Sequence, residues 1–163
     1  MPTGETDRTG LAGELRQFAG VRDAGIASLP TPRLEHLPVG LRCVLREDYL
    51  SSLSEEFSRA SHEGDHAVAL DTGLTLLALY VVLYPPNYPQ IGMHLLELTK
   101  TGWNAQFSAD MMEDERKLAK QRLGRFLNMS KRILTTYGLE GDEGGPLSEI
   151  EVLENILSGE WIP

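Results

Sequence analysis

Two histidines and one glutamate, His62, Glu63 and His66, occur at the spacing H-E-x-x-H. On a helix this spacing places both imidazoles on one face as zinc ligands and leaves the glutamate to act as a general base. Gly64 and Asp65 lie inside the motif, and a glycine followed by an aspartate is typical of the turn between two helices. We therefore interpret the segment as a turn and expect no metal and no cofactor. A small zinc hydrolase with His62 and His66 as metal ligands stays open as an alternative function.

A basic segment is followed by an acidic one near the carboxyl end of the chain. Residues 116–132 contain seven basic residues and no acid, whereas residues 139–163 contain seven acids and no base. Two solvated helix faces are the simple interpretation, because exposed ion pairs contribute only about 0–1 kcal/mol each. The alternative hypothesis is that the last helix folds back over the basic helix and covers a groove that could otherwise bind an acidic peptide. Truncation after Gly138 would then improve the binding of acidic peptides.

The elements that must position these residues are helices, and the most apolar stretch of the chain is the central one. It runs from Ala67 to Tyr84, and its large apolar residues recur at intervals of four and three, which predicts a helix. Pro85 and Pro86 end it. A strand is the competing interpretation, but the stretch is far longer than a usual strand. A helix that is apolar on most of its circumference must pack between neighbours.

Further helices are predicted on both sides of the central one. Amphipathic patterns indicate helices over residues 39–61, about 90–105, 111–137 and 148–157. Gly138 is expected to end the helix over residues 111–137. Residues 1–38 are rich in Gly and Pro, so they are predicted to form a flexible linker with one short helical candidate at residues 11–18. Residues 159–163 are expected to be a tail.

Two of these helices match each other when the chain is shifted by 53 residues, which pairs Leu70 with Leu123 and Val81 with Leu134. Periods of this length are typical of helical repeats, whose units bury their apolar faces only against one another. The alternative is that two long amphipathic helices match by chance.

Four glycines fall inside predicted helices: Gly73, Gly92, Gly102 and Gly124. Each costs a helix about 1 kcal/mol relative to Ala, and close approach of another helix usually offsets such a cost. At least Gly73 or Gly124 is therefore predicted to lie at a helix crossing.

Several segments resemble the tetratricopeptide-like repeat family. They are Gly64-Asp65 as the turn, Ala69-Leu70 as the small packing position and Pro86-Asn87-Tyr88-Pro89 after a proline-terminated helix. Residues 83–92, 133–138 and 147–151 are more narrowly similar to the helical C-terminal domain of the SET and MYND protein lysine methyltransferases. The resemblance covers about residues 37–158. It implies an all-α fold of stacked antiparallel hairpins over residues 39–158, with a concave surface that contacts a partner protein or, in the intact enzymes, flanks the substrate cleft.

The catalytic residues of that family have no counterparts here. The chain has no Asn-His-Ser-type segment, and its single cysteine, Cys43, cannot supply the family's zinc ligands. We therefore expect a non-catalytic protein-protein interaction module. The C-terminal portion of a protein lysine methyltransferase is a further alternative.

Lys100 and Asn104 lie four residues apart on one predicted helix. They resemble the Lys and Asn with which some tetratricopeptide domains hold the terminal carboxylate of a peptide. Leu98 falls at the family's packing position, so the register is displaced and a solvated helix face is the alternative. Together with Arg122 and Arg125 of the basic segment, they form the predicted peptide-binding set.

Charge and composition narrow the partners and the compartment. The 24 acidic residues outnumber the 15 Lys and Arg residues, for a net charge of −9, which opposes binding to nucleic acid or to an anionic membrane. The single cysteine cannot form an internal disulfide, and the first residues are polar where a signal peptide would be basic and then apolar. We expect an intracellular protein, cytoplasmic or nuclear, that binds a protein or peptide, with an acidic partner favoured by the basic segment.

Overall fold

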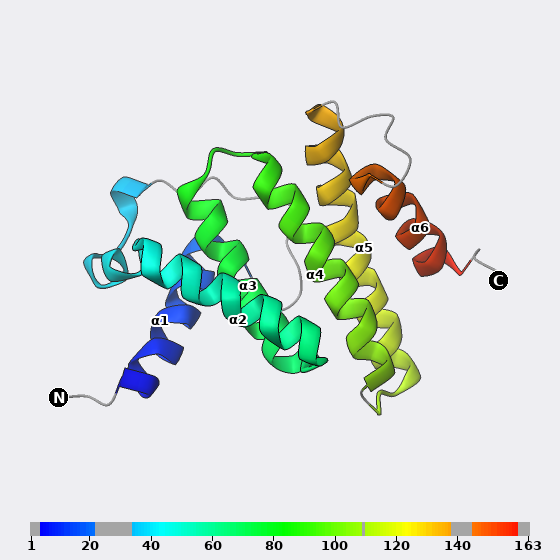
Figure 1. Cartoon of the computed structure of the whole chain (residues 1–163), viewed down its shortest axis with the longest axis horizontal. Coiled ribbons are helices and arrows are strands. Elements are labelled where there is room, and N and C mark those ends of the chain that lie inside the picture. Colours follow the sequence, from blue (N-terminus) through cyan, green and yellow to red (C-terminus); the bar gives the residue numbers. More distant parts are fainter. Residues whose placement is uncertain (1–3, 22–33, 109, 138–144, 160–163) are drawn as a thin grey trace. The chain divides into compact units, whose positions relative to one another are not determined.

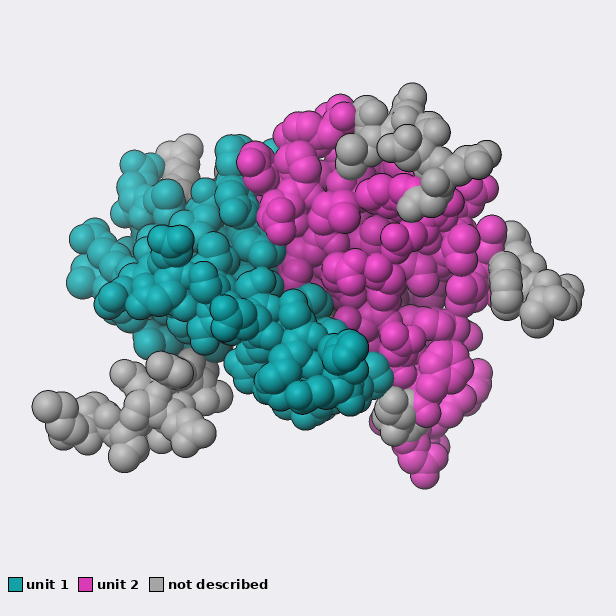
Figure 2. Space-filling model, viewed as in Figure 1, with its two compact units in different colours: residues 1–86 teal, residues 87–163 magenta. Residues whose placement is uncertain are grey.

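The chain is all-α, as predicted. The computed structural model describes residues 4–21, 34–108, 110–137 and 145–159, which form six α-helices, two short 3-10 helices and no strand (Figure 1). The chain divides into two compact units, residues 1–86 and residues 87–163, and Figure 2 colours them separately. The boundary between the units lies inside the domain predicted over residues 39–158.

Unit 1 is an antiparallel helical hairpin with a third helix packed against it. It contains α1 (Gly4–Ala19), α2 (Glu47–Glu63) and α3 (His66–Leu83), and the 3-10 helices η1 (Leu34–His36) and η2 (Val39–Val44). The hairpin consists of α2 and α3, and α1 packs against α3 and η2. The helix predicted over residues 39–61 is therefore divided into η2 and α2.

The turn between α2 and α3 confirms the predicted helix break. Gly64 adopts a left-handed conformation with φ of +79°, which a glycine reaches without steric cost, and its N–H donates to the carbonyl oxygen of Ala60. Asp65 then caps α3, because its side chain accepts a hydrogen bond of 3.3 Å from the backbone N–H of Val68. One helix ends and the next begins within two residues.

The central helix α3 is buried on most sides, as its composition predicts. Every residue from Thr72 to Val82 is buried except Leu74, which is half-buried. The helix ends at Tyr84, which is extended in front of Pro85. Among the described residues, α3 is the one helix long and apolar enough to cross a membrane, with a mean hydropathy of 1.7, and 61% of it is buried in the structure. Helices in the core of a folded protein have the same composition.

The structure differs from the sequence prediction at the amino end. The helical candidate at residues 11–18 belongs to a longer helix, α1, although residues 1–38 were expected to be a flexible linker. Leu15 and Ala19 are fully buried, and α1 packs against α3. The prolines that suggested a linker do not interrupt α1, because all of them except Pro2 come after this helix in the sequence. Residues 22–33 of the predicted linker lie outside the described residues.

Unit 2 is a second antiparallel hairpin followed by a third helix. It consists of α4 (Pro89–Ser108), α5 (Glu113–Thr136) and α6 (Pro146–Ser158). The hairpin is formed by α4 and α5, and α6 packs mainly against α5 and also against α4. The last helix therefore lies on the basic helix, in agreement with the alternative hypothesis and not with two separate solvated faces. Gly138, expected to end α5, and most of the predicted tail lie outside the described residues.

The close approach between α4 and α5 is made by glycines of α4. A Cβ atom on Gly92 would lie 3.0 Å from side-chain atoms of Ile133 and Leu134, and one on Gly102 would overlap Leu123. Ser130 of α5 also donates a hydrogen bond of 2.7 Å to the carbonyl oxygen of Gly92. Gly124 has nothing within 4 Å of such a Cβ, so of the two predicted crossing positions only Gly73, which is buried, stays a candidate.

The proposed 53-residue shift pairs α3 with α5, and each is the second helix of a hairpin. Val81 and its counterpart Leu134 are both buried. Tyr84 and its counterpart Tyr137 differ, since Tyr137 is exposed and Tyr84 is half-buried. Leu70 and Leu74 are half-buried, whereas their counterparts Leu123 and Leu127 are buried, so the two helices share only part of their buried positions.

Candidate peptide-binding surface

The H-E-x-x-H segment does not lie on a helix. His62 and Glu63 are the last residues of α2, His66 is the first residue of α3, and the left-handed Gly64 separates them. Glu63 forms an ion pair of 2.6 Å with Arg59, one turn earlier on α2. The arrangement that would place both imidazoles on one helix face, with the glutamate as a base, is therefore not formed. Within the ranges that the structure describes, no group of three or more His, Cys, Asp or Glu side chains is close enough to hold a metal ion.

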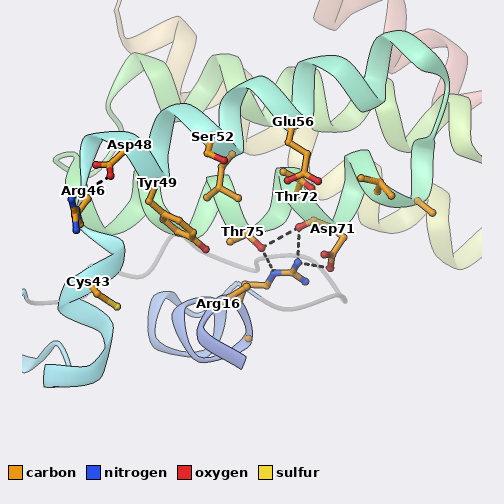
Figure 3. Close-up of a pocket in the computed structure, with 15 residues that line it drawn as sticks. Arg16, Cys43, Arg46, Asp48, Tyr49, Ser52, Glu56, Asp71, Thr72 and Thr75 are labelled. Atoms are coloured by element: carbon orange, nitrogen blue, oxygen red, sulfur yellow. Dashed lines mark hydrogen bonds and ion pairs between the residues drawn. The ribbon is translucent and has the colours of Figure 1, made fainter. Parts of the chain in front are cut away.

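A hollow of about 880 Å³ lies in unit 1, lined by residues of α1, η2, α2 and α3 (Figure 3). Arg16 of α1 reaches across it to α3. Its Nε donates to the hydroxyl of Thr75 at 2.9 Å, and a terminal nitrogen contacts both the carbonyl oxygen and the carboxylate of Asp71. Arg46, on another wall, pairs with Asp48 at 3.3 Å. The positive groups of the hollow are thus bound to groups of the chain itself, and Arg16 holds α1 on the hairpin.

The basic residues predicted to bind a peptide lie in unit 2, where Lys100 has two carboxylate partners. The ammonium nitrogen of Lys100 lies 2.6 Å from a carboxylate oxygen of Glu97 and 2.9 Å from one of Glu149 on α6. Partial burial by itself lowers the pKa of Lys100, but the hydrogen bonds and negative charges of the two glutamates outweigh it, so the pKa is raised above its usual value. Lys100 is therefore charged at neutral pH and engaged with a glutamate from another helix.

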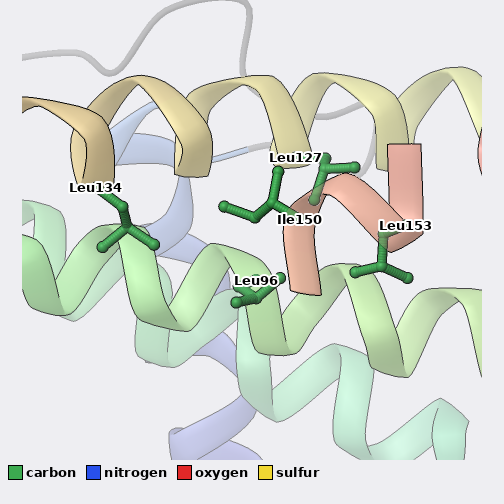
Figure 4. Close-up of a cluster of buried hydrophobic side chains, with 5 residues drawn as sticks. All are labelled: Leu96, Leu127, Leu134, Ile150 and Leu153. Atoms are coloured by element: carbon green, nitrogen blue, oxygen red, sulfur yellow. The ribbon is translucent and has the colours of Figure 1, made fainter. Parts of the chain in front are cut away.

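α6 lies across α4 and α5 as an acidic amphipathic helix. Its Ile150 and Leu153 are buried against residues of the other two helices, namely Leu96, Leu127 and Leu134 (Figure 4). On the flanks of this apolar contact, Glu149 pairs with Lys100 and Glu154 pairs with Lys131 of α5 at 2.9 Å. The surface formed by α4 and α5 thus already holds a helix whose buried face is apolar and whose flanks carry carboxylates.

The four residues of the predicted peptide-binding set lie on two helices of unit 2, α4 and α5. Lys100 and Asn104 share one face of α4, where Asn104 is exposed. Arg122 lies nine residues before Lys131 on α5, which is two and a half turns, so the two side chains point to opposite sides of that helix. The Nε atom of Arg122 is buried without a hydrogen-bond partner. Arg125 is exposed and lies on the same flank of α5 as Arg122.

An aromatic and basic cluster that was not predicted from the sequence joins the carboxyl end of α4 to the amino-terminal part of α5. The rings of Trp103 and Phe107 meet edge to face with their centroids 5.2 Å apart. Lys120 of α5 places its ammonium nitrogen 5.9 Å from the centroid of the Trp103 ring. Phe107 is 73% exposed. The aromatic spacing on α4 was visible in the sequence, but its contact with Lys120 depends on the register in which the two helices pack.

Comparison of the chain with protein-family models, with curated proteins and with solved structures gave no match.

Proposed function

We propose that the chain is a non-catalytic helical protein-interaction module whose unit 2 binds an acidic segment of a partner protein. The observation that carries the proposal is the position of α6, whose Glu149 and Glu154 pair with Lys100 and Lys131. A surface that holds an acidic helix of its own chain has the charge and shape to hold one from another chain.

The finer fold class, a tetratricopeptide-like stack of antiparallel hairpins, belongs to the same proposal. It is supported by the two hairpins α2–α3 and α4–α5 and by the burial of both Val81 and Leu134, which the 53-residue shift pairs. Domains built from such hairpins bind their partners on extended helical surfaces. The resemblance to the C-terminal domain of the SET and MYND lysine methyltransferases also favours a protein partner, because it implies a concave helical surface that contacts one.

Several basic residues remain for an external partner in addition to those that hold α6. Arg116, Lys117 and Lys120 are exposed on α5, whereas Lys131 of the same helix pairs with Glu154 of α6. Each exposed charge attracts an acidic segment only weakly in salt, but a cluster raises both the rate and the selectivity of association. The positive charge of α5 is thus a local feature of a chain whose net charge is −9.

The proposal is tested with a labelled peptide that has the sequence of residues 146–159, compared with the same peptide in which Glu149, Glu151 and Glu154 are replaced by Gln. Fluorescence anisotropy with the intact chain should show binding of the acidic peptide at low salt, weakening as salt is added. The Gln peptide should bind at least about tenfold more weakly, which corresponds to about 1.4 kcal/mol. Equal affinity of the two peptides would contradict the proposal.

A chain truncated after Gly138 provides the second arm of the test. It lacks α6, so Lys100 and Lys131 lose their partners and the apolar cluster around Leu127 is uncovered. The acidic peptide should therefore bind the truncated chain more tightly than the intact one. Circular dichroism must first show that the truncated chain keeps its helices, because the loss of α6 removes part of the core of unit 2.

A further inference from the structure

The face of α4 and α5 on which α6 packs continues beyond the residues that contact α6. On α4, the covered part is lined by Met93, Leu96 and Lys100, which contact α6 residues or the core that they form. At the same alternation of three and four residues, the stripe continues to Trp103 and Phe107. The two aromatic side chains therefore extend the same face of α4 past the place where α6 is bound.

The facing stripe of α5 continues in the same direction. Leu127, Lys131 and Leu134 contact α6, and Gly124 and Lys120 precede them at intervals of three and four residues. A Cβ on Gly124 would have nothing within 4 Å, so there is room above the backbone at this point. The contact between Lys120 and Trp103 shows that the two stripes meet there. We call the surface of Trp103, Phe107, Lys120 and Gly124 the open groove.

The open groove repeats the chemistry that α6 uses, with an apolar floor beside a lysine. In the covered part, Ile150 and Leu153 fill the floor and glutamates pair with the flanking lysines. In the open groove, the aromatic rings of Trp103 and Phe107 form the floor and Lys120 provides the flanking charge. Burial of an exposed aromatic ring by an apolar side chain is favourable, and a carboxylate beside Lys120 would complement its charge.

We propose that the open groove binds an acidic amphipathic helix of a partner protein, placed end to end with α6 along the α4–α5 surface. The partner helix packs its apolar face on Trp103 and Phe107 and places a carboxylate next to Lys120. The first turn of α5 carries three acids, Glu113–Glu115, so the partner's carboxylates lie on the Lys120 side and not at that turn. This inference rests on the proposed function and assigns its binding position in the intact chain.

The test uses the intact chain and the acidic peptide of residues 146–159 as the probe. Phe107→Ala should weaken binding by about tenfold, because a central aromatic contact is lost from the interface with the single peptide helix. Leu118→Ala is the matched control, since Leu118 is an exposed apolar residue of the same hairpin that points to the opposite side of α5 from Lys120. The control should leave the affinity within about twofold of the parent chain. Both side chains are largely exposed, so neither substitution should unfold unit 2.

The charge of the open groove is tested in the same way. Lys120→Glu should weaken binding by about tenfold at physiological salt, because it replaces an attractive charge with a repulsive one. Arg132→Glu makes the same change of net charge at a position remote from the open groove and should weaken binding only slightly. If the peptide binds but Phe107→Ala and Lys120→Glu have no more effect than their controls, the open groove is not the binding position, although the proposed function stands. If no acidic peptide binds, the proposed function itself fails.

The oligomeric state separates a partner helix from a second copy of this chain. Sedimentation velocity should show the same species for the intact chain and for Phe107→Ala. A dimer that becomes a monomer on Phe107→Ala would identify a second copy as the occupant of the open groove and would overturn the inference.

Discussion

Lys131 on α5 and Glu154 on α6 form an ion pair with 2.9 Å between the ammonium nitrogen and a carboxylate oxygen. Both side chains are partly exposed, at 51% and 32%. Four residues earlier on α5, Leu127 is buried against Ile150 of the same α6 helix. The pair therefore marks the edge of an apolar contact, and the two kinds of interaction contribute differently to the attachment of α6.

The apolar contact should hold α6 in place and the ion pair should orient it. Leu153→Ala removes buried side-chain volume and is expected to lower the free energy of unfolding by about 2–5 kcal/mol. A double-mutant cycle of Lys131→Ala and Glu154→Ala should give a coupling energy below about 1 kcal/mol, because the pair is partly exposed. Urea denaturation measures both. A coupling energy larger than the cost of Leu153→Ala would show that the ion pair, and not the apolar contact, holds α6 in place.

Two helical glycines of unit 2 should respond to alanine in opposite directions. Gly92→Ala introduces a Cβ 3.0 Å from the side chains of Ile133 and the fully buried Leu134, so it should destabilise the chain by about 1–2 kcal/mol despite the better helix propensity. Gly124→Ala meets open space and should stabilise the chain by about 0.5–1 kcal/mol. Thermal or urea unfolding of the two variants measures the difference. Stabilisation by Gly92→Ala would show that α4 and α5 approach less closely than described.

Arg16 should be the main polar attachment of α1. Its side chain is only 16% exposed and bonds to Thr75 and to the backbone and side chain of Asp71, so Arg16→Met should cost about 1–3 kcal/mol. Asp71→Asn should cost less than about 1 kcal/mol, because the carboxylate is 74% exposed. Amide hydrogen exchange gives the local readout: Arg16→Met should speed exchange in α1 more than in α5. Unchanged protection of α1 would exclude this role.

The ion pairs of Lys100 should make the stability of unit 2 depend on alkaline pH. The pKa of Lys100 is raised above its usual value of 10.5 in the folded chain. The folded state therefore binds the proton more tightly than the unfolded state, and this contribution is fully present below the unfolded pKa and is lost as the pH rises through the folded pKa. The stability difference between the parent chain and Lys100→Met should be constant from about pH 7 to 9 and should shrink above about pH 10. A difference that does not change across this range would contradict the assignment.

The sequence predicted the helices and one of the long-range contacts for clear physical reasons. Gly64 and Asp65 prevent a continuous helix through the histidine motif, and the structure contains the expected turn. The opposite charges of residues 116–132 and 139–163 gave two interpretations, and the ion pair of Glu154 with Lys131 agrees with the one in which the last helix lies over the basic helix. These signals are local or carried by composition, so no knowledge of packing was needed.

Other features depend on packing between distant residues and were not predicted. Arg16 finds its partners 55 and 59 residues later in the chain, and no short pattern indicates that pairing. The contact of Lys120 with Trp103 depends on the register of α4 and α5, which is fixed where Gly102 faces Leu123. The position of Arg122 on the side of α5 opposite to Lys131 could have been predicted from the sequence, because their spacing of nine residues places them on opposite sides of one helix.

The account depends most on the claim that the α4–α5 surface binds acidic amphipathic helices. The most direct measurement is a nitrogen–proton correlation spectrum of the labelled intact chain, titrated with the acidic peptide of residues 146–159. We expect progressive shifts of the Trp103 indole signal and of the amides around Phe107 and Lys120, and much smaller shifts with the Gln peptide at the same concentration. Shifts confined to other parts of the chain, or equal shifts with both peptides, would contradict the claim.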